Sequence, residues 1–217
     1  MKGKFVHFID PPRLKFDFIR SKADEFRQRF VQPPEMLPIP IMEIVEIQLR
    51  ILPVPILGLK DKIDIDGFLT RDLKHICIDY GVYMDEKQEN RLRFTYAHEV
   101  GHYVLHQKEI QECDFRTPEE WIHFHEDFLE DDLNWFEQHA YEFAGRLLVP
   151  RDALINEIKN LSPKMDEYKK MAGDDEENLI LAISRLVCKK FQVSPEVISR
   201  RIRIEKAWPK AEREFLV

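Results

Sequence analysis

Residues 91–106 constrain the fold more than any other segment, because a helical pattern and a metal-binding spacing coincide there. The segment contains no proline, and its apolar residues fall on one side of a helix. His98 and His102 are four residues apart, so both can point a ring nitrogen at one ion from the same helix face. Glu99 completes the pattern His-Glu-x-x-His. The segment therefore predicts a helix that carries part of a metal site.

Two histidines do not complete a catalytic metal site. A catalytic zinc site has three protein ligands and an open position for a water, whose pKa the metal lowers to about 7. We expect Glu99 to take the proton from that metal-bound water and to deliver it to the leaving amine. The expected cofactor is zinc, and the expected reaction is metal-assisted hydrolysis of an amide.

The third ligand is not expected on the same helix. His106 continues the spacing, but it lies about 12 Å from His98 along a straight helix with a rise of 1.5 Å per residue. It is therefore expected to be structural. The long metzincin pattern requires a third histidine at the position of Lys108, so this chain does not fit that class.

A second helix, expected over about residues 132–148, offers a better candidate. Glu137 stands at the N-terminal end of an apolar stripe on this helix, formed by Ala140, Phe143, Ala144, Leu147 and Leu148. A carboxylate in line with a buried stripe is costly unless it is paired or binds a metal, which favours Glu137 as the third ligand. His139 and Glu142 are the alternatives. They lie roughly 200° and 140° around the helix from Glu137, so they are expected to face solvent.

Other segments predict an α+β fold, with a small antiparallel sheet packed on helices and a zincin-type HExxH helix. Apolar spacing predicts helices over residues 19–30 and 41–49. Short strands are expected at residues 51–54, 68–69 and 74–79, the last of which alternates apolar and polar residues. A helix start is expected at Thr117-Pro118.

The chain divides by composition into three parts. Residues 1–156 are expected to form the zinc metallopeptidase domain, with the N-terminal helices and the small sheet. Residues 157–178 are polar and predict a flexible connector with at most one short helix. Residues 179–217 predict a helical, helix-turn-helix-like extension packed on the same domain, with Ser194 capping its second helix.

Composition excludes several classes of function. The 217 residues carry a formal net charge of -7, which argues against a general nucleic-acid-coating surface. The three cysteines form no C-x-x-C pair and predict reduced thiols in a cytoplasmic protein. No targeting or membrane-spanning segment is expected, and neither is a membrane partner.

Three quoted stretches resemble the ImmA/IrrE family of zinc-dependent metallopeptidases. RFTYAHEVGHYVLH (residues 93–106) is similar to the metal-helix block of that family. EQHAYEFAGRLLVP (137–150) is similar to the block whose first Glu supplies the third metal ligand, a role that carries over to Glu137. FQVSPEVISRRI (191–202) resembles the ending that is common in the family.

The resemblance implies a cytoplasmic endopeptidase that cleaves a helix-turn-helix transcriptional repressor, often encoded beside it on a mobile element or in a stress-response locus. One position departs from the family pattern. Relatives often have Asn or Asp where this chain has Tyr141, and a short polar side chain there can hydrogen-bond a zinc-bound histidine. The resemblance therefore does not show which side chain hydrogen-bonds the zinc-bound histidine in this chain.

Two other functions stay open. The basic segment 179–210 favours a DNA-binding regulator, through Arg200, Arg201 and Arg203, although direct DNA binding is not expected in an acidic chain. The other is an inactive protein that docks a repressor and retains a structural zinc. Two smaller hypotheses are also open. The strand at residues 74–79 could be a sheet edge that pairs with an extended substrate segment. His123 and His125 could form a second metal site.

Overall fold

The computed structural model describes residues 12–112, 120, 130–173 and 175–207, and they form an α+β fold that is mostly helical. The strands are β1 (Leu52–Ile56), β2 (Gly67–Leu69) and β3 (His75–Asp79). The helices before the sheet are α1 (Phe16–Phe30), α2 (Ile41–Glu43) and the π-helix η1 (Ile44–Gln48). Those within and after it are α3 (Leu59–Ile63), α4 (Tyr80–Met84), η2 (Glu86–Gln88), α5 (Glu89–Leu105), α6 (Gln107–Glu112), α8 (Glu130–Leu148), α9 (Arg151–Asn160), η3 (Ser162–Lys164), α10 (Met165–Ala172), α11 (Glu176–Phe191) and α12 (Pro195–Glu205).

The three strands form a mixed sheet, so the expectation of a purely antiparallel sheet was wrong. The strand order is β1-β3-β2, with β3 parallel to β1 and antiparallel to β2. The chain reverses direction through α3 before it enters β2, and the β2–β3 hairpin then places β3 beside β1. Because β3 is the central strand, residues 74–79 cannot act as the edge that pairs with a substrate.

The two edges of this sheet differ in what they offer to a further strand. In β1, Leu52 donates its N–H to the carbonyl of Lys74 on the β3 side. Pro53 and Pro55 occupy the intervening positions, whose nitrogens face outward and carry no hydrogen. Proline therefore blunts the outer edge of β1, and β2 is the edge that retains outward-facing N–H groups.

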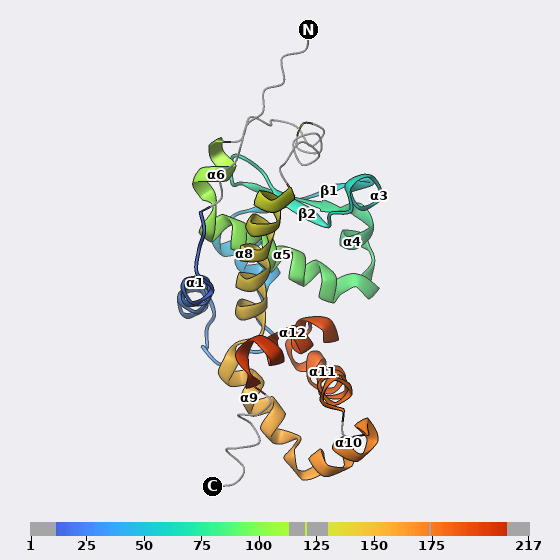
Figure 1. The fold of residues 1–217 in the computed structure, drawn as a ribbon. Helices are drawn as coiled ribbons and strands as arrows, with labels where there is room; N and C mark the ends of the chain where they lie inside the picture. Colours follow the sequence, from blue (N-terminus) through green and yellow to red (C-terminus); the bar gives the residue numbers. More distant parts are fainter. Residues whose placement is uncertain (1–11, 113–119, 121–129, 174, 208–217) are drawn as a thin grey trace.

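Helices α5 and α8 pack against each other at the centre of the molecule (Figure 1). Figure 1 shows the sheet with α3 and α4 at one end of this pair and α9 to α12 at the other, while α1 packs beside α8. The expected stripe of α8 is fully buried in this interior: Ala140, Phe143, Ala144, Leu147 and Leu148. The helix pair is thus the frame from which the candidate site residues project.

Helices α11 and α12 pack against each other across a short turn, and the helix-turn-helix-like character of this segment stays a prediction. Gln192 ends α11 with a left-handed backbone (φ 51°), and Ser194 begins α12 by accepting a hydrogen bond from the N–H of Val197. Pro195 stands at the first turn, where its missing N–H costs nothing.

Residues 157–178 contain more helix than the polar composition predicted. They include the end of α9, the turn η3 and all of α10. The division of the chain at residues 156 and 178 stays a prediction. The expected helix start at Thr117-Pro118 and the two histidines His123 and His125 lie outside the described residues.

In the described part of the chain, no helix combines the length and the apolar character needed to cross a membrane.

Candidate metal centre

The middle of α5 brings three side chains of the HExxH segment together. Ligand-type atoms of His98, Glu99 and His102 all lie within 4.8 Å of one another. The Nε2 atoms of the two histidines are 3.1 Å apart, as their spacing of one helical turn predicts. Glu99 and His102 are buried and His98 is partly buried. This cluster therefore forms away from bulk water.

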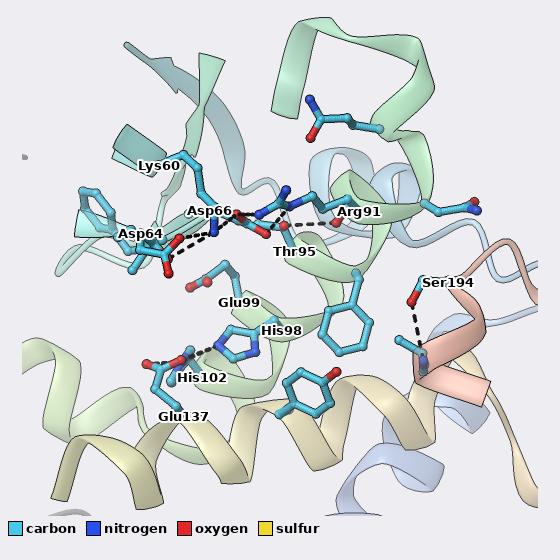
Figure 2. A pocket seen from close by; sticks show the side chains of 18 of the residues that line it. Lys60, Asp64, Asp66, Arg91, Thr95, His98, Glu99, His102, Glu137 and Ser194 are labelled. Carbon is cyan, nitrogen blue, oxygen red and sulfur yellow. Dashed lines mark hydrogen bonds and ion pairs between the residues drawn. The ribbon is translucent and has the colours of Figure 1, made fainter. Parts of the chain in front are cut away.

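Glu137 reaches the same point from α8. Its Oε2 lies 2.9 Å from His98 Nε2, and its Oε1 lies 3.5 Å from His102 Nε2. Figure 2 shows the three side chains converging, with Glu99 beside them. Burial opposes the charged form of Glu137, but the two histidines hold its pKa well below the ordinary value. Burial also opposes the charged form of His98, but the carboxylate of Glu137 raises the pKa of His98.

The close approach of the two helices at Gly101 makes this convergence possible. A Cβ placed on Gly101 would lie 2.9 Å from the Cα of Ala140 and 3.0 Å from its carbonyl oxygen. Both atoms belong to the backbone of α8, so they cannot move out of the way as a side chain would. Gly101 therefore sets the distance between the histidines of α5 and Glu137 of α8.

We expect Gly101→Ala to separate α5 from α8 and to lower the affinity for zinc by about tenfold or more, because ligand placement within about 0.5 Å matters at such sites. Chelator competition measures the affinity. Gly81→Ala in α4 is the matched control, since the nearest atom to its Cβ is a side-chain oxygen of Asp79, at 3.1 Å. Equal zinc affinity in the two variants would show that the contact with Ala140 does not position Glu137.

Glu99 is oriented by the sheet as well as by its helix. The backbone N–H of Leu69, in β2, donates a hydrogen bond to its carboxylate. Burial raises the pKa of Glu99, although the two neighbouring histidines and this hydrogen bond act in the opposite direction. A buried carboxylate with a raised pKa is suited to accept and release a proton.

The cluster opens into a cleft of about 830 Å³, which is large enough for a peptide side chain and its neighbours. Strand β2 and helix α5 line it, together with Glu137 and the beginning of α12. Figure 2 shows a charged wall facing the histidines, in which Arg91 forms a bidentate pair with Asp66 at 2.6 Å and Lys60 lies nearby. The sequence carried no spacing that would have indicated this wall.

The comparison with protein families covers the segment that contains these residues. Residues 64–203 match the IrrE N-terminal-like domain of the Peptidase_M78 family, over more than half of the chain. The chain belongs to the ImmA/IrrE family. Membership supports a metallopeptidase-type function and implies a metal cofactor and a protein substrate. No curated protein and no solved structure matches this chain.

The donor set of this ImmA/IrrE protein suits a bound metal ion. Two imidazole nitrogens and the two oxygens of one carboxylate, all of them acceptors when unprotonated, face one another with contacts of 2.9 to 3.5 Å. A cation placed among them would satisfy these lone pairs at once, whereas without one each contact needs its own proton. His98, His102 and Glu137 are therefore the residues that fit a metal.

Two histidines outside the predicted ligand set are also buried here. His106 is fully buried at the end of α5, and burial lowers its pKa to about 2, so its ring is neutral. His139 is fully buried as well, with Nδ1 3.2 Å from His106 Nε2, so the expectation that it faces solvent was wrong. Glu142, expected at the surface, is buried too and pairs with Arg20 and Arg201. Both errors have one cause: α8 is covered by α1, α5 and α12, so it has more than one buried side.

Tyr141, which stands where relatives often have a short polar residue, takes a place in the wall of the cleft. Its ring lies 4.8 Å from that of Phe94, and the guanidinium of Arg200 lies over it at 4.4 Å. A rigid aromatic surface thus borders the cleft beside the candidate ligands.

Proposed function

We propose that this protein is a zinc-dependent endopeptidase whose protein substrate is a helix-turn-helix transcriptional repressor. The observation that carries the peptidase proposal is the convergence of His98, His102 and Glu137 beside Glu99 at the inner wall of a cleft. The repressor as substrate rests on the family resemblance of the three quoted stretches. In this proposal His98, His102 and Glu137 are the metal ligands, and Glu99 is the catalytic residue.

The spacing of the three donors supports zinc as the ion. Tetrahedral zinc with bonds of about 2.0–2.1 Å places its ligand atoms about 3.3 Å from one another. The two Nε2 atoms are 3.1 Å apart, and each lies near a different oxygen of the Glu137 carboxylate, at 2.9 Å for His98 and 3.5 Å for His102, so these spacings are close to that value. A set of two histidines and one carboxylate is also an established donor set for catalytic zinc.

Bound zinc would act as a Lewis acid, lowering the pKa of a water and polarising the peptide carbonyl. Glu99 takes up the proton of the water that attacks the carbonyl and returns it to the leaving amine. The N–H of Leu69 holds the carboxylate in place, and the buried position of Glu99 raises its affinity for that proton. Partial burial around His98 limits the access of bulk water to the same point.

Among the described strands, none pairs with the outer edge of β2, and this edge is the proposed recognition element for the substrate backbone. Asp79 donates to the carbonyl of Asp66, and Thr70 donates to that of His75, so the alternate residues Gly67 and Leu69 turn their polar groups away from β3. Both residues line the cleft. Because the N–H of Leu69 already donates to Glu99, a substrate backbone would pair with the N–H and carbonyl of Gly67 and with the carbonyl of Leu69. An extended substrate segment can therefore add as a strand along β2, which demands little of the substrate sequence.

An ester in a substrate peptide removes one backbone N–H. At the position that pairs with β2 this replacement should raise KM, because a hydrogen bond to β2 is lost. The same replacement elsewhere in the peptide should leave KM unchanged.

The deciding experiment incubates the zinc-loaded protein with the repressor encoded by its genomic neighbour. We expect discrete fragments from wild type and none from Glu99→Gln. An intact repressor under all conditions would remove this substrate while leaving the peptidase proposal to be tested on unstructured proteins. A repressor that binds wild type and Glu99→Gln equally, without cleavage, would favour the docking alternative.

Removing the metal gives a second expected outcome. A chelator should abolish cleavage, because Glu99 alone does not polarise the peptide carbonyl. Adding one equivalent of zinc should restore it, as followed by fragment release and by metal analysis. Full cleavage by protein that contains no metal would contradict the proposal.

The three arginines behind the DNA-binding alternative are engaged within the chain. Arg201 is buried, so it does not reach a nucleic acid. Arg203 pairs with Glu177, and Arg200 donates to Gln138 while lying over Tyr141. These contacts favour a packing role for α12.

A further inference from the structure

We propose that His106 and His139 form a relay of two imidazoles that positions His102 for metal binding through its Nε2 atom. They are positioning residues, since neither reaches the point where the candidate ligands converge. The proposal rests on the proposed function only in taking His102 as a metal ligand. The relay crosses the α5–α8 interface, because His106 ends α5 and His139 belongs to α8.

The contacts form an unbroken line of ring nitrogens. His102 Nδ1 lies 3.0 Å from His106 Nδ1, and His106 Nε2 lies 3.2 Å from His139 Nδ1. Both relay residues have no exposed surface, so water does not compete for these nitrogens. Each contact at this distance needs one donor and one acceptor, and therefore holds one proton.

Proton counting gives the relay a direction. A metal bound at His102 Nε2 leaves the proton of that ring on Nδ1, which donates to His106 Nδ1. His106 then carries its proton on Nε2 and donates to His139 Nδ1, so His139 carries its own on Nε2. The reverse arrangement would put a proton on His102 Nε2, the nitrogen that faces His98 and Glu137, and so would oppose metal binding.

The end of the line is an independent observation. Among the described residues, His139 Nε2 is a buried atom with no hydrogen-bond partner. Buried polar atoms are rarely left unpaired, and those that are call for an explanation. His139 takes part in the relay through its other nitrogen, Nδ1, which accepts from His106 Nε2–H, and an apolar side chain at this position would leave that buried donor without an acceptor.

Packing keeps the rings in the orientation that the relay needs. Phe136 stacks on His102 at 4.4 Å with 30° between the planes, and on His106 at 4.2 Å with 24°. The stacking fixes the planes of both imidazole rings. The hydrogen bonds then decide which nitrogen of each ring faces its neighbour, because a ring flip would keep the stack but break a hydrogen bond.

The test measures zinc affinity by chelator competition in wild type, His106→Phe, His106→Gln and His139→Phe. Loss of a hydrogen-bond partner behind a metal ligand lowers affinity by about 10–100-fold, and we expect this for His106→Phe. Gln can accept from His102 and donate to His139, so His106→Gln should recover most of the affinity. His139→Phe should give an intermediate loss. Thermal unfolding without metal shows whether each variant folds.

A second readout separates positioning from a structural role. In zinc-loaded protein with 15N-labelled histidine, the NMR shifts should place the proton of His102 on Nδ1 and that of His106 on Nε2. A proton on His106 Nδ1 would overturn the relay, and so would unchanged zinc affinity in folded His106→Phe and His106→Gln. If wild type itself binds no zinc, the proposed metal site fails first, and the two failures are thereby distinguished.

Discussion

Glu99→Gln is expected to lower peptidase turnover by about 10²–10⁴-fold, the range for losing a general acid-base residue. Gln keeps the shape of Glu and can still accept the hydrogen bond from the N–H of Leu69. It cannot take up a proton, so the attack of water loses its base while the fold and the three candidate ligands are unchanged. Turnover is measured as fragment release at saturating substrate, and zinc content by metal analysis on the same sample.

Glu112→Gln in α6 is the control for this substitution. Glu112 is exposed and 3.9 Å from Lys108, so the same chemical change there should leave both turnover and zinc content as in wild type. Turnover of Glu99→Gln within a fewfold of wild type would remove Glu99 as the proton carrier. A loss of zinc in Glu99→Gln would show instead that the carboxylate contributes to metal binding.

Arg201→Met is expected to lower the free energy of unfolding by about 3–5 kcal/mol, the cost of breaking a buried ion pair by removing one partner. Arg201 is 2% exposed, donates to Glu142 at 2.8 Å and pairs with Glu205. Its removal leaves two buried carboxylates short of a partner. Because a domain is stable by only about 5–15 kcal/mol, the urea midpoint should fall markedly.

Two further variants make this prediction specific. Arg203→Met, two residues away on α12, breaks an ion pair with Glu177 that is exposed to water, so it should change stability little. Arg201→Met combined with Glu142→Leu replaces one buried pair by apolar groups and should recover part of the loss, while Glu205 keeps its pair with Arg146. Equal urea midpoints for Arg201→Met and Arg203→Met would show that the buried network does not stabilise the fold.

Some features followed directly from local spacing. Four residues separate His98 from His102, and a helix converts that spacing into two nitrogens 3.1 Å apart. Gly101 lies between Glu99 and His102 in the same helix, and the structure places the backbone of Ala140 against it. Glu137 follows the same rule, because it stands at the end of the buried stripe of α8 and its carboxylate lies 2.9 Å from His98 Nε2.

Other features depended on contacts between distant segments. The direction of β1 relative to β3 is set by the crossover through α3, which alternation within a strand does not reveal. The prediction that His139 and Glu142 face solvent was wrong because α8 has a second buried face besides its apolar stripe. Other helices supply the side chains that cover these two residues. Glu142 is covered by Arg20 and Arg201, and His139 by His106.

The sequence by itself determined the α+β class, the two central helices and the candidate residues His98, Glu99, His102 and Glu137, because their spacing acts within single helices. Only the tertiary structure decided which sheet edge borders the cleft, that Leu69 supports Glu99, and that His106 and His139 stand behind His102. The physical reason is that spacing along a helix sets distances of a few ångströms locally. The partner of a buried polar group is chosen by how whole elements pack.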